Sequence, residues 1–217
     1  MSLSAGADWS GTPDKPMGAI DLFSFCVVAF ENSDAVNEAC HVTRPALGMA
    51  ADEEFHGHDM SDAMNAAVLE MGMHLNLQIG ILFVNKAAAP LEGRIILPPP
   101  AVFTAQIALR LLERFLPICP LRDLWCDEDL KGQAAQEFVT AVRRLSRAHH
   151  PQSKLKTRLR DSRKSNLVQI ADVANYTLTR QARGGKSEPV LENVLRKIRG
   201  DDRNLILGPM PWEPEEE

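Results

Sequence analysis

The sequence predicts an α/β fold in which a mixed β-sheet is covered by helices on both faces. Its 217 residues, 45% hydrophobic and 24% charged, suit a single globular domain. Apolar segments of strand length come first in a cluster, and strand-like and helix-like segments alternate after them, an order typical of such a sheet. We assign residues 1–200 to this domain and residues 201–217 to a flexible, acidic, proline-rich tail.

The first half of the chain contains four expected strands and one expected helix. Residues 3–10 precede a turn signal, Ser-Gly-Thr-Pro, and read as a strand. Leu22–Phe30 is rich in Phe and Val, as in a buried strand, and a third strand is expected near Cys40–Thr43. A helix is expected from Ser61, with Ser61 or the next residue as its cap, to Met73. Leu77–Val84 is almost wholly apolar, which is typical of a strand covered on both faces.

The second half alternates between helices and strands. Helices are expected where apolar residues recur every three or four positions, and a short apolar run predicts a strand. In Lys154–Arg160 every second residue is basic, which indicates a strand with one basic face or, equally, an exposed basic ribbon. The other expected elements are helices at 103–116, 133–148, 166–180 and 189–198 and a strand at Leu121–Cys126.

Cysteine usage and hydropathy bear on the compartment. The 4 cysteines form no CxxC pair, so we expect reduced, mostly buried thiols, with a zinc site as the alternative. The sequence shows no secretory signal and no run of about 18 apolar residues. We therefore expect a cytoplasmic protein that does not associate with membranes, and the sequence indicates no oligomeric state.

Charge is distributed unevenly along the chain. Residues 1–142 hold 8 basic against 19 acidic residues, whereas residues 143–203 hold 16 against 6. A basic segment beside an acidic one suits a protein that binds both a polyanion and a cation. The alternative is a solvated helical face with acid–base matching between the two halves. The basic residues expected to contact a nucleic acid are Arg143, Arg147, Lys154, Lys156, Arg158 and Arg160.

Asp172 is the only acid in an otherwise core-facing helical stretch. A carboxylate at the edge of an apolar stripe needs a hydrogen bond, a cation or a metal ion to compensate it. Gln169 lies one turn before Asp172 and Tyr176 one turn after it, so the three share a helix face. Asp172 is either a site residue, with Gln169 positioning a ligand or phosphate, or a satisfied core acid that holds a loop amide.

Three other acids precede or follow expected elements. Asp8 stands at the end of the first strand, where it faces a site or simply initiates a turn. Glu54, with His56 nearby, is a single-carboxylate metal ligand or part of a polar loop before a helix. Asp127 follows a strand, where acids often face a functional crevice, and the alternative is an acid at a helix N-terminus.

The order of these pieces resembles the ribonuclease-H-like fold. More closely, over roughly residues 5–180, the chain resembles the uncharacterised bacterial and phage family known as domain of unknown function 3800. The residues that carry this resemblance are Asp8-Trp9-Ser10-Gly11, Glu54-Phe55-His56-Gly57 with Met60-Ser61, Val84-Asn85-Lys86, and Leu167-Val168-Gln169-Ile170-Ala171-Asp172-Val173-Ala174. The last of these motifs is the most specific.

The resemblance implies a metal-dependent nuclease or nuclease-like protein that acts on nucleic acid phosphodiesters. Asp8, Glu54 and Asp172 would hold Mg²⁺ or Mn²⁺. Asp127, which is not part of the resemblance, would be a further ligand if its strand ends near the site. Two departures from the family pattern matter: Trp9 stands where the family has an acid, and Asn85 stands where an acid is common. A non-catalytic, degenerate module that binds nucleic acid or protein on the same fold is therefore the alternative, and a structural or regulatory partner protein is a third.

Overall fold

The computed structural model describes residues 3–11, 22–86, 99–127, 132–151 and 154–211. Within these ranges the chain forms one sheet of 6 strands in the order β5-β4-β1-β2-β3-β6. The strands are β1 (Leu3–Ser10), β2 (Leu22–Phe30), β3 (Gln78–Asn85), β4 (Leu121–Asp127), β5 (Lys156–Arg160) and β6 (Leu205–Pro211). The first three are antiparallel neighbours, while β4 runs parallel to β1, β5 parallel to β4, and β6 parallel to β3.

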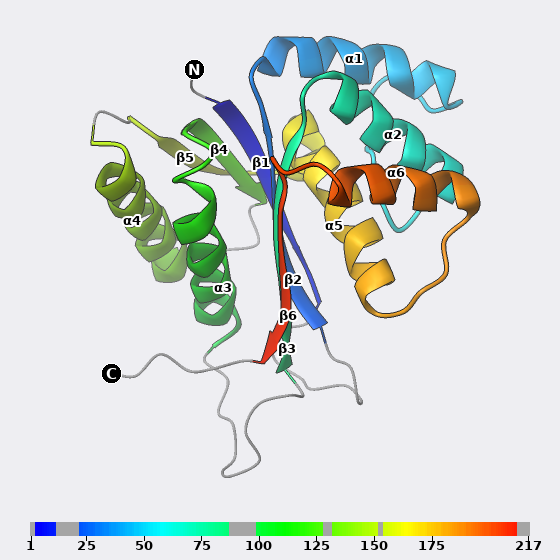
Figure 1. Ribbon diagram of the computed structural model, residues 1–217. Helices are drawn as coiled ribbons and strands as arrows, with labels where there is room; N and C mark the ends of the chain where they lie inside the picture. The colour runs from blue at the N-terminus through cyan, green and yellow to red at the C-terminus, as the bar shows by residue number, and fades with distance from the viewer. Residues whose placement is uncertain (1–2, 12–21, 87–98, 128–131, 152–153, 212–217) are drawn as a thin grey trace.

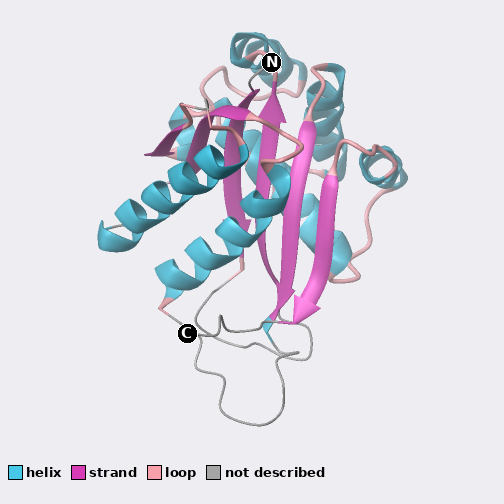
Figure 2. Cartoon of the chain, turned by 60° about the vertical axis from the view of Figure 1, so that its left-hand side comes forward, coloured by secondary structure: helices cyan, strands magenta, loops and turns pink. Residues whose placement is uncertain are grey.

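Helices cover both faces of this sheet, as Figures 1 and 2 show. One layer consists of α3 (Pro100–Phe115) and α4 (Gly132–His149). The other consists of α1 (Ser33–Ala46), α2 (Asp62–His74), α5 (Asn166–Ala182) and α6 (Pro189–Arg199). The expected mixed α/β fold with helices on both faces is confirmed. None of the helices in the described ranges combines the length and apolarity that a membrane crossing needs.

The alternation of side chains along the strands divides the core in two. In β1, Ala5 and Ala7 pack in the cluster under α3, together with Phe23 and Phe25 of β2. The residues that alternate with these along β2, Cys26, Val28 and Phe30, belong to the second cluster, beneath α1, α2, α5 and α6. Successive side chains point to opposite faces of a strand, so each position is assigned to one helix layer.

Two expectations from the sequence are wrong. The expected strand near Cys40–Thr43 lies inside α1. Asn32 caps this helix by accepting hydrogen bonds from two backbone amides of its first turn, and Val36 and Cys40 are buried on one face at a helical spacing. The expected tail also contains a strand, because β6 pairs with β3 from Gly80↔Leu205 to Asn85↔Pro211. Residues 212–217 lie outside the described residues.

The expectations for the cap of α2, for the basic segment and for the burial of the cysteines are confirmed. Ser61 caps α2, since its Oγ accepts a hydrogen bond from the Met64 amide at 3.2 Å. The alternating basic segment is a strand, β5, rather than a ribbon. The four cysteines are free and buried, and burial raises the pKa of Cys40 to about 11 and that of Cys119 to about 12. At neutral pH the thiols of Cys40 and Cys119 are therefore protonated, and the expectation of buried thiols is confirmed.

Candidate functional site at the carboxyl ends of parallel strands

Asp8 lies near the end of β1, on the sheet face that α5 covers. The helix reaches β1 so closely at Gly6 that a Cβ there would overlap the Leu167 carbonyl. Only glycine allows this approach. It brings α5 side chains that lie one and two turns beyond Leu167 close to the strand. The backbone contact at Gly6 therefore sets the position of Asp172 and Asn175 relative to Asp8.

A buried polar chain holds the Asp8 carboxylate. Asn175 Nδ2 donates to Asp8 Oδ2 at 3.0 Å, and Asn175 Oδ1 accepts from Ser24 Oγ at 2.7 Å and from Thr179 Oγ1 at 3.3 Å. Ser24 and Asn175 are fully buried, and Thr179 is 1% exposed. The two hydroxyls on Oδ1 orient the amide so that its NH₂ group faces Asp8. Sequence reasoning missed Asn175, although its spacing of three from Asp172 places both on one helix face.

Carboxylates surround Asp8 and raise its pKa. Burial is the main cause, and the negative charges of Asp172 and Asp127 add to it, while the hydrogen bonds from Asn175 and the Trp9 amide act in the opposite direction. In the register of β1 with β4, Ala7 lies beside Cys126, so the next pair along is Asp8 and Asp127. The carboxyl ends of two parallel strands thus bring both acids to one edge.

Asp172 extends this group of acids toward Glu54. The pKa of Asp172 is raised by burial, which outweighs the lowering by the Gly57 amide and His56, and Glu54 and Asp59 raise it further. The Gly57 amide donates to Asp172 Oδ2 at 2.8 Å, and His56 Nδ1 lies 3.6 Å from the same oxygen. Asp172 thus holds a loop amide, as one reading of the sequence expected, and also lies among other acids.

The loop that carries Glu54 is fastened to α5 and α1. Arg44 is 6% exposed, donates from Nε to the Glu53 carbonyl at 2.6 Å, and packs its guanidinium over the Phe55 ring at 4.4 Å. Its NH2 group donates to Gln169 Oε1 at 2.8 Å and to Asn166 Oδ1 at 2.6 Å. Arg44 thus links the loop to α5 through neutral acceptors.

Gln169 is part of this fastening. Its Oε1 accepts from the Phe55 amide at 3.1 Å as well as from Arg44, and its Nε2 donates to the Ser162 carbonyl at 3.1 Å. Because both Oε1 and Nε2 of Gln169 bond to protein groups, its contacts favour a role in holding the Glu54 loop. Its expected role in positioning a ligand stays a prediction.

Trp9 and Asn85 do not remove acids from the immediate surroundings of Asp8. Trp9 points to the opposite sheet face, where its ring stacks on Phe25 with a centroid separation of 6.3 Å. Asn85 lies two strands away from β1 and four residues beyond Ile81, which the register places level with Asp8 through Cys26. Standard sheet spacings put Asn85 roughly 16 Å from Asp8. Neither replacement changes the immediate neighbours of Asp8.

The donor set suits a hard divalent cation only in part. Carboxylate oxygens are the ligands that Mg²⁺ and Mn²⁺ prefer, and the acids here are close enough to repel one another. In the described ranges, however, no group of three or more His, Cys, Asp or Glu side chains is arranged to hold a metal ion. Glu128 and Asp129, next to Asp127, lie outside the described residues.

The basic residues expected to bind nucleic acid lie in two different layers. Lys156, Arg158 and Arg160 are in register with Asp123, Trp125 and Asp127 of β4. Arg143 and Arg147 lie on α4, in the opposite helix layer. Lys154, exposed, precedes β5.

Comparison with known proteins identifies the architecture. A chain of the structure of the PCNA:RNase HII complex from Archaeoglobus fulgidus matches with a TM-score of 0.53 at 12% identity, covering 99% of this chain and 97% of that one. The fold is ribonuclease-H-like. The ribonuclease H2 from Pyrococcus horikoshii OT3 matches with a TM-score of 0.51 at 11% identity, covering 92% and 89% of the two chains. No family model and no curated protein matches the sequence.

Proposed function

We propose that this ribonuclease-H-like chain is a divalent-metal-dependent nuclease or nuclease-like protein that acts on nucleic acid phosphodiesters. The observation that carries the proposal is the meeting of Asp8 and Asp127 at the carboxyl ends of β1 and β4, with Asp172 of α5 near enough for its charge to help raise the pKa of the buried Asp8. Acids held close together without a compensating cation destabilise the fold. The similarity to an RNase HII structure supports this proposal through the fold alone. Membership of the uncharacterised family named above is part of the same proposal.

Asp8 and Asp172 would hold the cation, with Asp127 beside Asp8 and Glu54 beside Asp172. A bound Mg²⁺ or Mn²⁺ supplies a Lewis acid that stabilises charge on a phosphodiester oxygen. Asn175 keeps the Asp8 carboxylate in one orientation, and the Gly57 amide does the same for Asp172. Arg44 holds the loop that carries Glu54 against α5.

A nuclease assay tests the site assignment. Purified protein is incubated with single-stranded, duplex and hybrid oligonucleotides and Mn²⁺, beside Asp172→Asn and the control Glu38→Gln, which neutralises an exposed acid on α1. We expect cleavage by wild type and by the control and none by Asp172→Asn. Equal activity of wild type and Asp172→Asn contradicts the assignment of Asp172.

A non-catalytic binding module on the same fold is the second candidate, favoured by the absence of a ready three-ligand group among the described residues. Calorimetric titration of metal-free protein with Mn²⁺ separates the two candidates. Heat that is measurable in wild type and lost in Asp8→Asn supports a cation site whether or not cleavage occurs. Nucleic acid binding without either heat or cleavage favours the module.

A further inference from the structure

The outer edge of the sheet presents a row of cations on the same face as the acids. Residues in register on neighbouring strands share a face, so Lys156, Arg158 and Arg160 lie on the face of Trp125 and Asp127. The intervening Thr157 and Leu159 point into the opposite layer, where Leu159 packs on the cluster under α3 and α4. Because α5 packs mainly on β1 and β2, the three basic side chains remain exposed.

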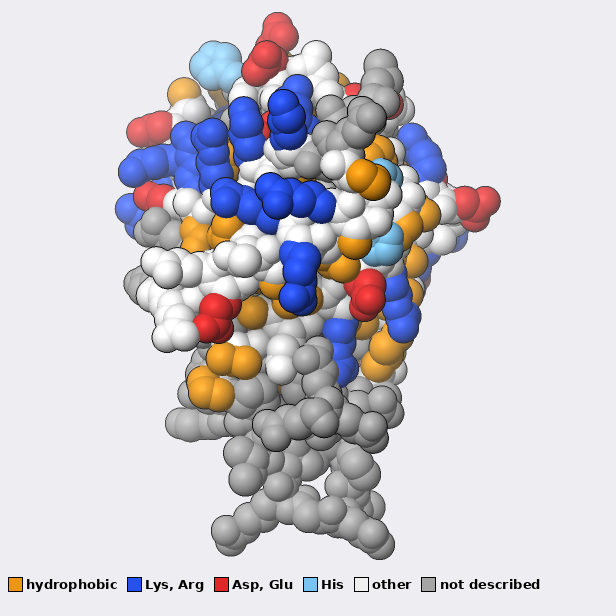
Figure 3. All heavy atoms as spheres, turned by 90° about the vertical axis from the view of Figure 1, so that its left-hand side faces the viewer, with side chains coloured by type: hydrophobic (Ala, Val, Ile, Leu, Met, Phe, Trp, Pro, Cys, Tyr) orange, Lys and Arg blue, Asp and Glu red, His pale blue; other side chains and the backbone are white. Residues whose placement is uncertain are grey.

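These three side chains, called the β5 row below, form no ion pair in the part of the chain that the structure describes, although Asp123 and Asp127 lie beside Lys156 and Arg160 on β4. Basic residues beyond β5 do pair with acids of the first half of the chain, as Arg180 does with Asp62 at 2.6 Å and Lys197 with Glu70 at 3.6 Å. At β5, therefore, no ion pair supports the alternative in which the basic segment neutralises the chain's own acids. Figure 3 shows Lys and Arg side chains gathered on this side of the molecule.

The β5 row leads to the acids. Arg160, its last member, is in register with Asp127, which lies next to Asp8 across β4 and β1. Beyond β5, the short helix η2 (Ser162–Lys164) brings Arg163 Nε to 4.0 Å from Glu54 Oε2. Cations thus follow one sheet edge up to the acids, as a track for a polyanion that must reach a cation site requires.

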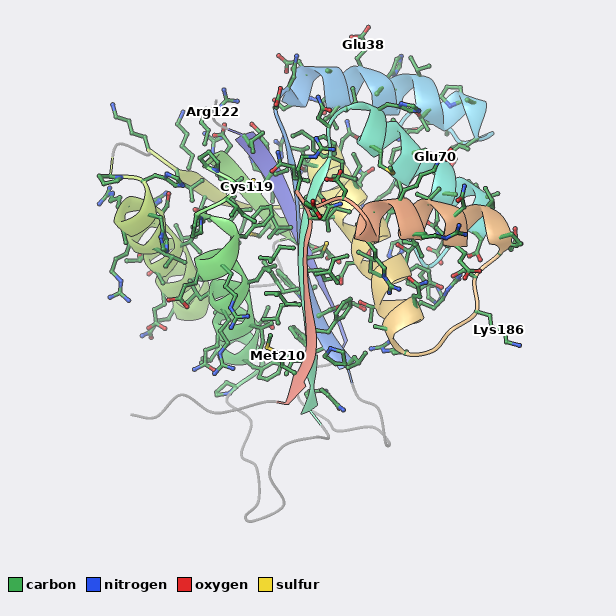
Figure 4. All side chains as sticks on the ribbon, in the orientation of Figure 1. Glu38, Glu70, Cys119, Arg122, Lys186 and Met210 are labelled. Atoms are coloured by element: carbon green, nitrogen blue, oxygen red, sulfur yellow. The ribbon has the colours of Figure 1, made fainter. Side chains whose placement is uncertain are left out.

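Other basic residues of the chain lie off this line. The arginines of α4 belong to the helix layer on the other face of the sheet (Figure 1). Lys186 lies in the connection between α5 and α6, across the molecule from β5, and Arg122 is paired with Asp123 at 2.7 Å (Figures 1 and 4). Of the basic side chains named so far, the β5 row and Arg163 alone combine exposure with a place beside the acids.

We infer that the β5 row binds the phosphate backbone of a nucleic acid strand and directs it over the carboxyl ends of β4 and β1, and that the α4 arginines are not part of this track. The inference rests on the proposed function and adds the surface through which the substrate is held. From the sequence, the basic residues of β5 and of α4 were expected to contact nucleic acid together. The inference assigns this role to the β5 row and not to the α4 arginines.

Binding measured without metal tests the inference separately from catalysis. Fluorescence anisotropy with a labelled single-stranded oligonucleotide and the matching duplex is recorded in EDTA from about 50 to 200 mM salt. The test variant is Lys156→Gln with Arg158→Gln, and the control is Arg143→Gln with Arg147→Gln, which removes the same charge from α4. All four side chains are exposed, so both variants should fold, and their melting temperatures check this.

We expect the β5 variant to weaken binding on the order of tenfold near 0.1 M salt and to reduce the salt slope by about 1.4–1.8, since each lost phosphate contact removes about 0.7–0.9. The α4 control should bind within about twofold of wild type. Equal weakening by both variants, or no weakening by the β5 variant, overturns the inference. So does tighter binding of poly-glutamate than of either oligonucleotide, which would indicate an acidic protein partner.

The outcomes distinguish this inference from the proposed function. If wild type binds oligonucleotides through the β5 row but neither cleaves them nor binds Mn²⁺, the surface stands and the nuclease proposal fails. If wild type cleaves and the β5 variant binds and cleaves equally well, the nuclease proposal stands and the surface assignment fails.

Discussion

Replacing Asn175 by Leu should destabilise the protein and remove the hydrogen bond that orients the Asp8 carboxylate. The change keeps the approximate side-chain shape but removes one hydrogen bond to Asp8 and two from Ser24 and Thr179. Neutral bonds contribute about 1 kcal/mol each and a bond to a charged group about 1.5–3 kcal/mol. The Ser24 and Thr179 hydroxyls keep their mutual contact at 2.7 Å, which offsets part of the loss. We expect a net loss of about 2–4 kcal/mol in the free energy of unfolding.

Urea unfolding of a double-mutant cycle measures this effect. Asn175→Leu and Asp8→Ala should couple by about 1 kcal/mol or more, because the two side chains are in direct contact. Thr177→Val is the matched control: Thr177 is equally buried on α5, but its hydroxyl bonds only to the Val173 and Ala174 carbonyls. The control should be additive with Asp8→Ala within about 0.5 kcal/mol.

Mn²⁺ provides a second readout. If Asn175 orients Asp8 for a cation, the rise in melting temperature that Mn²⁺ produces should shrink in Asn175→Leu and persist in Thr177→Val. Additivity of Asn175→Leu with Asp8→Ala, together with an intact response to Mn²⁺, would refute the reasoning. Asn175 would then be a core amide without influence on the site.

Three further outcomes are expected. The pKa of Asp8 is raised in the folded protein, so the folded protein binds this proton more tightly than the unfolded chain does. The stability of the metal-free protein should therefore fall as the pH rises above about 4 and through the folded-state pKa. In thermal melts from pH 5 to 8, the melting temperature should fall less in Asp8→Asn than in wild type. Arg44→Met removes the three hydrogen bonds that the buried guanidinium donates, and urea unfolding should show a loss of about 3 kcal/mol or more in the free energy of unfolding. Amide exchange at Phe55 should become faster. Arg44→Lys should recover little of the lost stability, because an ammonium group lacks the planar fork of a guanidinium. Gly57→Ala places a Cβ 2.8 Å from Tyr176 Cβ, so we expect a loss of about 1–3 kcal/mol and a weaker Mn²⁺ response in the same thermal melts; an unchanged response would show that the Gly57 amide does not position Asp172.

Most of the fold was accessible from the sequence because its elements carry strong local patterns. The apolar run of β2 and the capped start of α2 identify those elements without tertiary information. The prediction of a strand at Cys40–Thr43 was wrong because four residues are too few to show whether the apolar positions repeat as in a strand or as in a helix. The edge strand β6 was not predicted because its Pro and Gly residues are typical of a tail, and it becomes a strand only through pairing with β3.

By itself, the sequence determined which acids stand at the ends of strands and on the apolar helix, and that a basic strand follows. The tertiary structure alone decided which of these side chains meet. Parallel pairing of β1 with β4 places Asp127 beside Asp8, and the close approach of α5 to Gly6 brings Asn175 into contact with Asp8. It also turned Trp9 away from Asp8 and separated the β5 row from the α4 arginines. The physical reason is that sheet register and side-chain alternation are set by packing between distant segments, which no local pattern records.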